Sequence, residues 1–289
     1  MSEFTEVLEG LEAALASGEN FALATVVAAR GSTYRRPGAR LLVRTDGTTA
    51  GSISGGCLES EIEGVALEVM ASGDARLLTV DHSHEDDAHL GWGMGCRGVV
   101  EVLVEAAGSA APVAEALRAS RFSPVTLSTD PATAAHVVGE VREGWFVERM
   151  EPPPGLLVCG DGPEARPIAE AGAVLGWDIT SVVAAQELPV VTERTSAVVC
   201  SHNFERDLAF LRALLPSDAA YVGVLGPRSR GQRLVEELGG DIGRIHAPAG
   251  LDLGAETPEE IAQSVVAEIL AVLNGKSGRP LRDREGPIH

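Results

Sequence analysis

The 289-residue sequence predicts an α/β protein, in which an N-terminal α+β domain precedes a Rossmann-like, doubly wound parallel sheet. Three observations support this prediction. After residue 155, short apolar runs alternate with segments of helical periodicity, which is typical of parallel βαβ units. Before that point, strands follow one another through tight turns such as Asp46-Gly47. Three consecutive prolines, 152–154, favour an extended, unpaired segment and separate the two patterns.

The N-terminal domain is expected to span residues 1–106. Phe4, Val7 and Leu11 recur at helical spacing, which predicts an opening helix. Asp46-Gly47 is a strong hairpin signal, because the turn requires positive φ. The expected elements are a helix over 4–15, a strand over 21–27, a hairpin of 40–45 and 48–53, a helix after residue 57, and strands over 77–80 and 99–104.

A connecting segment is expected over residues 107–154, and the Rossmann-like domain over 155–289. The connecting segment is expected to contain a helix within 107–123 and strands over 125–128, 136–141 and 145–149, the last two turning at Glu143-Gly144. The parallel strands are expected over 156–159, 179–183, 197–201 and 221–225, with helices near 164–175, 204–215 and 229–238. The final helix is expected to begin at Thr257, where Glu260 completes a capping box, and to end at Gly275.

The chain is strongly acidic, with 23 Lys and Arg residues against 42 Asp and Glu residues and a net charge of −19. Such an excess, without a basic block, argues against binding to a nucleic-acid backbone or to an anionic membrane surface. No apolar run approaches the ~18 residues of a spanning helix, and the first residues are acidic where a signal peptide would be basic. Four cysteines make no disulfide framework. We therefore expect a soluble, cytoplasmic protein.

Gly160, Gly162 and Ala165 match the G-x-G-x-x-A pattern of dinucleotide-binding turns, which follows a strand and opens a helix. Glycines at these positions let backbone N–H groups approach a phosphate. Two features argue against an ordinary nicotinamide cofactor: Asp161 places a negative charge in the loop, and Val183 stands where an acidic residue would bind the ribose. The pattern therefore indicates either a phosphate-bearing ligand or a turn that only preserves the fold.

Two cysteines follow glycine-rich turns, in Ser54-Gly55-Gly56-Cys57 and in Gly93-Met94-Gly95-Cys96-Arg97-Gly98. Cys57 precedes a helix, whose partial positive charge favours the thiolate, and Arg97 would stabilise the thiolate of Cys96. Two exposed thiols among backbone amides can hold a soft ligand. The alternative is that both are ordinary buried cysteines, which is what we expect of Cys159 and Cys200 in their apolar strands.

Three histidines, His82, His84 and His89, lie in or beside an acidic run and are candidate metal ligands by residue type alone. Their spacing matches no closed zinc pattern. A solvated loop that covers the nearby glycine-rich turn explains the same composition, and we favour this interpretation.

Several motifs recur in order over nearly the whole chain. They are Gly31-Ser32-Thr33 with Pro37-Gly38-Ala39, the segment Gly51–Glu59, Gly93–Cys96, Ser201-His202-Asn203 with Asp207, Gly223–Arg228, and Pro248–Glu260. In these motifs the sequence resembles the XdhC/CoxI family, which are accessory proteins of xanthine dehydrogenase and related molybdenum hydroxylases.

The resemblance implies a chaperone and not a turnover enzyme. Such a protein binds the molybdenum cofactor (molybdopterin), protects it while its terminal sulfido ligand is installed, and delivers it to an apo molybdenum hydroxylase such as xanthine dehydrogenase. It further implies a cysteine desulfurase as the sulfur source, and dimers are usual among proteins of this kind. Cys57 and Cys96 would then be the molybdenum ligands. The other implied cofactor contacts are Ser54, Gly55, Gly56, Gly95, Arg97, Gly160, Gly162, His202 and Arg228.

Three residues depart from the family's usual pattern: Arg97 replaces Gly, Pro163 replaces His, and Val183 replaces an acidic residue. The last two argue against nucleotide binding. The rival hypothesis is an NAD(P)-dependent oxidoreductase, which would use the Rossmann-like domain and a catalytic group such as His202. Asp161 and the missing ribose acid count against this rival, whereas the paired glycine-cysteine motifs favour the chaperone.

Overall fold

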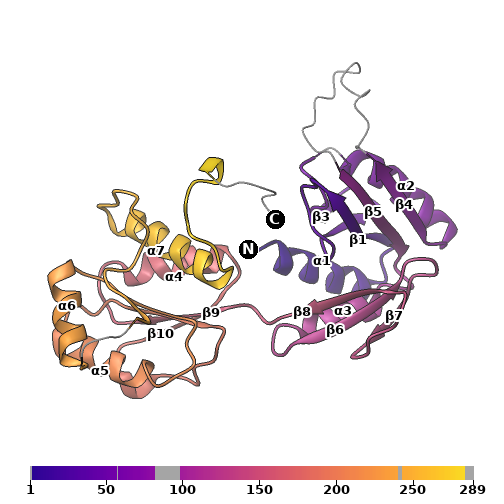
Figure 1. The fold of residues 1–289 in the computed structure, drawn as a ribbon. Helices are drawn as coiled ribbons and strands as arrows, with labels where there is room; N and C mark the ends of the chain where they lie inside the picture. Colours follow the sequence, from indigo (N-terminus) through magenta and orange to yellow (C-terminus); the bar gives the residue numbers. More distant parts are fainter. Residues whose placement is uncertain (1, 57, 82–97, 240–242, 284–289) are drawn as a thin grey trace. The chain divides into compact units, whose positions relative to one another are not determined.

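The structure, a computed structural model, describes residues 2–56, 58–81, 98–239 and 243–283. The chain divides into two compact units, one from Ser2 to Pro152 and one from Pro153 onward, and each is described by itself (Figure 1). Within the described residues, no helix is long and apolar enough to cross a membrane.

The first unit is built on an antiparallel sheet of five strands in the order β3-β2-β1-β5-β4. The elements of this unit are α1 (Glu3–Ser17), β1 (Phe21–Gly31), β2 (Arg40–Arg44), β3 (Thr49–Gly51), α2 (Glu59–Ser72), β4 (Arg76–Asp81), β5 (Gly98–Ala106), α3 (Ala111–Ala119), β6 (Val125–Asp130), β7 (Ala135–Val138) and β8 (Phe146–Met150). The expected hairpin at Asp46-Gly47 is confirmed, with Gly47 at φ 81°. Strand β1 continues past its expected end, because a bulge between Val26 and Ala28 restores its pairing with β5.

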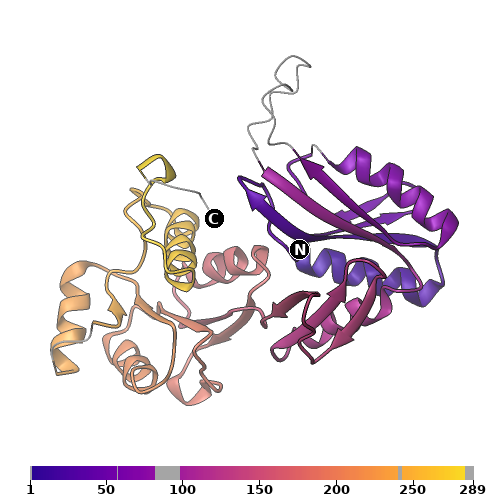
Figure 2. The same cartoon turned by 45° about the vertical axis from the view of Figure 1, so that its right-hand side comes forward.

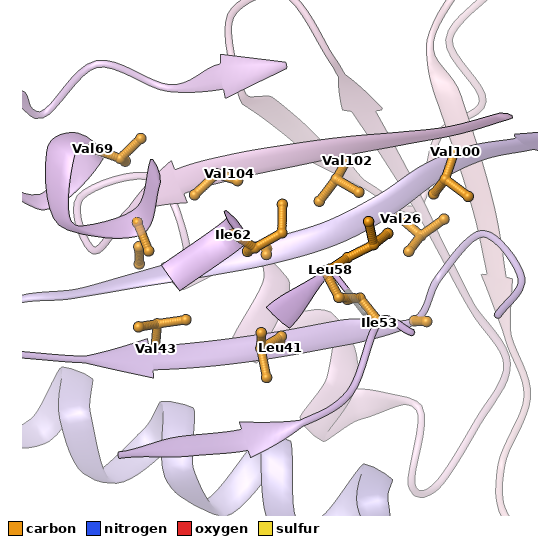
Figure 3. Close-up of a cluster of buried hydrophobic side chains, with 14 of the residues drawn as sticks. Val26, Leu41, Val43, Ile53, Leu58, Ile62, Val69, Val100, Val102 and Val104 are labelled. Atoms are coloured by element: carbon orange, nitrogen blue, oxygen red, sulfur yellow. The ribbon is translucent and has the colours of Figure 1, made fainter. Parts of the chain in front are cut away.

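Alternating residues of β1 supply two separate cores, one on each face of the sheet. Ala22, Ala24 and Val26 belong to the cluster that packs under α2, which Figure 3 shows. Phe21 and Leu23 belong to the cluster on the opposite face, with α1 and α3. This alternation is the period-2 pattern of a strand buried on both faces.

Residues 107–152 of the expected connecting segment 107–154 share this second core with the N-terminal residues. Figure 2 shows their ribbon beside that of α1. Leu117 of α3, Leu127 of β6 and Met150 of β8 pack in the same cluster as Leu8 and Leu11 of α1. The apolar side chains of the segment cover a sheet face that would otherwise be exposed.

The three-stranded sheet of this segment has the order β7-β6-β8. The expected turn at Glu143-Gly144 is present, with Gly144 at φ 81°, but the strands on either side of it pair with β6 and not with each other. β6 takes the central place because its residues 127–129 are buried. β7 ends at Val138, before the expected residue 141, where Gly139 has φ 86°.

The second unit is a parallel sheet of five strands in the order β10-β9-β11-β12-β13, which confirms the predicted doubly wound fold. Its elements are β9 (Gly155–Cys159), α4 (Ala165–Val174), β10 (Asp178–Val182), β11 (Thr195–Val199), α5 (Phe204–Leu214), β12 (Tyr221–Val224), α6 (Arg228–Glu237), β13 (Ile245–His246) and α7 (Pro258–Leu273). Strand β13 was not expected. The capping box at the start of α7 is confirmed, since Thr257 and Glu260 exchange hydrogen bonds.

Helices cover both faces of this sheet (Figure 1). Residues of α4 and α7 pack on Leu156 and Val158, whereas residues of α5 and α6 pack on Leu157 and Cys159. The chain leaves β9 in one direction to reach β10 and later crosses to β11 on the other side. The carboxyl ends of β9 and β11 therefore form the topological switch point, where ligands bind most sheets of this type.

Candidate functional site

In the first unit, the carboxylate of Glu59 closes the glycine-rich loop that precedes α2. It accepts hydrogen bonds from the backbone N–H groups of Ser54 (3.1 Å) and Leu58 (3.2 Å), and from the Ser54 hydroxyl. Burial alone would raise the pKa of this carboxyl. The hydrogen bonds from Ser54 and from backbone N–H groups, including that of Leu58, outweigh burial and hold the pKa below its ordinary 4.5.

Ser54 is buried and forms hydrogen bonds within this loop. Its hydroxyl oxygen accepts hydrogen bonds from the N–H groups of Gly56 (3.0 Å) and Leu58 (3.2 Å). Gly55 and Gly56 are exposed, and Gly56 has φ 105°, with no described residue other than its chain neighbours within 4 Å of the place of a side chain. The loop therefore presents bare backbone that is held in place by hydrogen bonds to Ser54 and Glu59, which suits the close approach of a ligand.

Residues 32–34 lie beside one glycine of each glycine-cysteine motif, Gly55 in the first and Gly98 in the second. A Cβ added at Gly55 would lie 3.4 Å from the Tyr34 ring, and one at Gly98 would lie 2.6 Å from the Thr33 side chain. Gly98 also pairs with Gly31, the last residue of β1. Gly55 stands two residues before Cys57, and Gly98 stands two residues after Cys96, so the chain leads to both cysteines from the same short segment.

The remaining predicted residues of this site lie outside the described residues: Cys57, Gly95, Cys96 and Arg97, together with His82, His84 and His89. Their roles stay predictions. Within the described ranges, no group of three or more His, Cys, Asp or Glu side chains could hold a metal ion.

In the second unit, two of the predicted contacts, Gly162 and His202, meet at the switch point, where a Cβ added at Gly162 would lie 2.6 Å from the His202 ring. His202 follows β11, and its Nε2 lies 2.8 Å from Oε2 of Glu164, a buried residue at the start of α4. His202 adopts φ 53°, which is uncommon for a residue with a side chain. Backbone outliers of this kind cluster at binding sites, so this pair is the strongest candidate for ligand contact in this unit.

The glycine turn beside it offers few free donors. The N–H of Gly160 donates to the Val182 carbonyl (2.8 Å), the N–H of Gly162 donates to the Cys200 carbonyl (3.1 Å), and Pro163 has no N–H. A Cβ at Gly162 would lie 2.3 Å from that Cys200 oxygen. The packing of the chain itself therefore requires these glycines, and their contact with a ligand stays a prediction.

The acidic residue of the turn has a partner, because Asp161 forms a 3.0 Å ion pair with Arg206. At the end of β10, Val183 is half exposed, and its N–H donates to the Glu187 carboxylate at 2.9 Å. Glu187 thus supplies a carboxylate near the position where dinucleotide-binding folds bind ribose, but this carboxylate caps the chain's own backbone.

In the described part of the chain, no hydrogen bond or ion pair joins Arg228 to His202. Arg228 lines a pocket of about 640 Å³, together with the loop Ala247–Ala255 and Ser264 of α7. Glu268 of α7 holds this loop by accepting hydrogen bonds from the Gly250 N–H (2.8 Å), the Tyr221 hydroxyl (2.6 Å) and His246 (3.0 Å).

Cys159 and Cys200 are buried, as the sequence predicts. Burial, followed by the Cys200 thiol and the Asp207 carboxylate, raises the pKa of Cys159. Burial, followed by the Glu164 carboxylate, raises the pKa of Cys200 to about 12. Both thiols are therefore protonated near neutral pH.

Sequence reasoning did not identify Tyr34 or Glu59. Glu59 stands five residues after Ser54, whereas a capping box places its acid three residues after the capping serine. Tyr34 lies in a loop without periodicity, and only the structure brings it to Gly55.

Two family models match the sequence. Residues 14–81 match the model described as the XdhC and CoxI family, and residues 156–269 match the model described as the XdhC Rossmann domain. Together they cover residues of both units.

Several named relatives match over most of the chain. The molybdenum cofactor insertion chaperone PaoD of Escherichia coli is 31% identical over 90% of this chain and 85% of its own length. A Bacillus subtilis protein, named as a probable xanthine dehydrogenase subunit, is 28% identical over 90% of this chain and 95% of its own. A crystal structure described as a xanthine dehydrogenase from Bacillus halodurans matches with a TM-score of 0.77 and 25% identity, over 97% of this chain and 99% of that chain.

Proposed function

Since this chain belongs to the XdhC and CoxI family, we propose that it is a maturation factor that binds the molybdenum cofactor and delivers it to an apo molybdenum hydroxylase. The names of two relatives, a molybdenum cofactor insertion chaperone and a probable xanthine dehydrogenase subunit, support this role. We further propose that the cofactor is protected on the chain while a cysteine desulfurase supplies its sulfido ligand. In this proposal the chain acts as a homodimer and has no turnover of its own.

The proposal rests mainly on one observation: residues 32–34 lie next to both Gly55 and Gly98. Because these glycines flank Cys57 and Cys96 in the sequence, one ligand could reach both thiols. Thiolates are suitable ligands for a soft metal such as molybdenum. The exposed backbone of Gly55 and Gly56 fits a large flat group, since its peptide planes carry no side chains.

In this proposal the residues of the first unit have distinct roles. Cys57 and Cys96 would hold the metal end of the cofactor, and the loop closed by Glu59 would keep Gly55 in a fixed position. Gly95 and Arg97, on either side of Cys96, would contact the cofactor from the second motif. When bound, the cofactor supplies the molybdenum centre that the recipient hydroxylase uses for oxygen-atom chemistry.

We propose that His202 and Arg228, with Gly160 and Gly162, contribute polar contacts in the second unit. The hydrogen bond to the Glu164 carboxylate fixes the ring of His202, which supports a binding role for this side chain. The N–H groups of Gly160 and Gly162 already donate to carbonyls of the chain. We therefore expect the side chains of His202 and Arg228 to contribute more to binding than the amides of the turn.

The decisive experiment measures molybdenum and pterin in the purified chain after anaerobic mixing with cofactor released from a donor hydroxylase. We expect about one cofactor per chain, and transfer to the apo hydroxylase. Titration with NADH and NADPH tests the rival oxidoreductase. Saturable NADH binding together with turnover of a carbonyl substrate would replace the chaperone with that rival.

A further inference from the structure

Tyr34 is an exposed aromatic residue beside the glycine loop. Its side chain is 60% exposed, although its ring packs on the backbone of Gly55. Three ring carbons, Cγ, Cδ2 and Cε2, lie 3.4–3.6 Å from the place of a Cβ at Gly55. Beyond Gly55, no described residue other than its chain neighbours lies within 4 Å of the place where the exposed Gly56 would carry a side chain. The ring and two residues without side chains therefore form a surface that a flat molecule can cover.

Two arginines close to Tyr34 in sequence have no carboxylate partner in the described residues. Arg30 precedes Gly31 at the end of β1, Arg36 follows Tyr34 by two positions, and both are exposed. The paired arginines of this unit are bound as Arg35–Glu3, Arg40–Glu148, Arg76–Glu68, Arg118–Glu12, Arg142–Glu140 and Arg149–Glu151. Glu101 is the diagonal cross-strand neighbour of Arg30, but no ion pair joins these two described residues. In a chain of net charge −19, two exposed arginines so close to Tyr34 in sequence favour an anionic ligand there.

We propose that Tyr34 stacks on the fused ring of a pterin and that Arg30 and Arg36 bind the phosphate of the same molecule. This proposal rests on the proposed function and assigns the parts of the cofactor that lie away from the metal. An aromatic side chain and a heteroaromatic ring gain stability by offset stacking, whereas an aliphatic side chain of similar size provides contact without it. Arginine suits a phosphate because its planar group can donate two parallel hydrogen bonds.

The test uses the full chain loaded with molybdenum cofactor released anaerobically from a donor hydroxylase, with the retained pterin measured by fluorescence after oxidation. Tyr34→Phe keeps the ring and should retain cofactor within about twofold of the original chain. Tyr34→Leu should weaken retention roughly tenfold, as expected for the loss of one stacking contact. Arg36→Met should weaken retention at low salt and much less at high salt.

Arg121 and Phe122 provide matched controls, because they are an exposed arginine and an exposed aromatic residue of the same unit. Arg121→Met and Phe122→Leu should leave retention unchanged. Tyr34→Leu retention equal to that of the original chain overturns the stacking proposal and leaves the chaperone role intact. Failure of the original chain to retain any cofactor overturns the proposed function, and this proposal with it. Melting curves of all variants check that exposed substitutions leave the fold unchanged.

Discussion

Glu59 and Ser54 close the glycine-rich loop onto the start of α2, through a 3.1 Å hydrogen bond from the Ser54 N–H to the Glu59 carboxylate. The same carboxylate accepts the N–H of Leu58 at the helix terminus. An anion of the chain itself therefore already occupies the position where a helix N-terminus would bind a phosphate. The phosphate of a ligand at this loop must find other partners. Arg30 and Arg36, which pair with no carboxylate of the described ranges, are available for it.

We expect Glu59→Ala to destabilise the first unit by about 1–2 kcal/mol, because it removes a cap from several N–H groups at once. The melting temperature should fall by about 2–4 °C for each kcal/mol, as usual for a unit of this size. Thermal unfolding followed by circular dichroism measures this change. Glu61→Ala is the matched control, because Glu61 is exposed in the same helical turn and should change stability by less than about 0.5 kcal/mol.

The stabilisation by Glu59 should also depend on pH. The folded-state pKa of this carboxyl lies below its ordinary value of 4.5, so the folded chain favours the charged form. The contribution is therefore complete above about pH 4.5 and is lost as the pH falls through the folded-state pKa. The original chain and Glu59→Gln should differ in unfolding free energy at pH 7 and converge in acid. A difference that stays constant down to about pH 3 would show that the carboxylate charge is not involved.

The sequence predicted the loop but not its support. The glycines and the serine before Cys57 stand out by composition, whereas Glu59 resembles any acid in the first turn of a helix. The role of Glu59 depends on how the glycine-rich loop folds back onto the start of α2, and no residue spacing in the sequence indicates this. Tyr34 is similar, because its contact with Gly55 joins two loops on either side of the β2–β3 hairpin.

The parallel sheet was predicted well, because β9, β11 and β12 are short apolar runs that are each followed by a helical pattern. Pairing in the sheet of β6, β7 and β8 was harder to predict. A turn signal such as Glu143-Gly144 predicts adjacent strands, but the burial of residues 127–129 places β6 in the centre. Strand β13 has only two residues, which is too short for any periodicity.

In the second unit, Glu268→Ala should destabilise the fold by about 1–3 kcal/mol, since it leaves the hydroxyl of Tyr221 buried without its acceptor. Tyr221→Phe should cost less, and the double variant should be more stable than the sum of the single effects predicts. Urea unfolding of the four proteins measures this coupling. Gln263→Ala, an exposed change on the same helix, is the control. Strict additivity would mean that the hydrogen bond contributes nothing.

Each unit has its own cores, so Ser2–Pro152 and Pro153–His289 should each fold when expressed alone. We expect a cooperative thermal transition from each fragment. Glu59→Ala should lower the transition of the first fragment only, and Glu268→Ala that of the second only. A fragment that unfolds without a transition would contradict this division of the chain.

Thiol labelling near neutral pH should separate the four cysteines into two classes. Cys159 and Cys200 should react slowly, because both are buried and burial raises the pKa of each thiol. Cys57 and Cys96 should react fast, because each follows a glycine-rich turn that we expect to leave the thiol accessible, and Arg97 directly follows Cys96. Mass spectrometry of peptides after timed alkylation gives the four rates.

Bound cofactor should slow the labelling of both fast thiols, if both hold the metal. Cys57→Ser and Cys96→Ser keep the side-chain size but replace a soft ligand with a poor one, so each should reduce cofactor retention. Their melting temperatures should stay near that of the original chain. Cys159→Ser is the contrasting control, because a hydroxyl placed in that core should cost stability and leave retention unchanged. If bound cofactor protects only one of the two thiols, the chaperone role stands but a site made by the pair is ruled out. If both Cys57 and Cys96 label slowly and their serine variants still retain cofactor, these two thiols belong to the core.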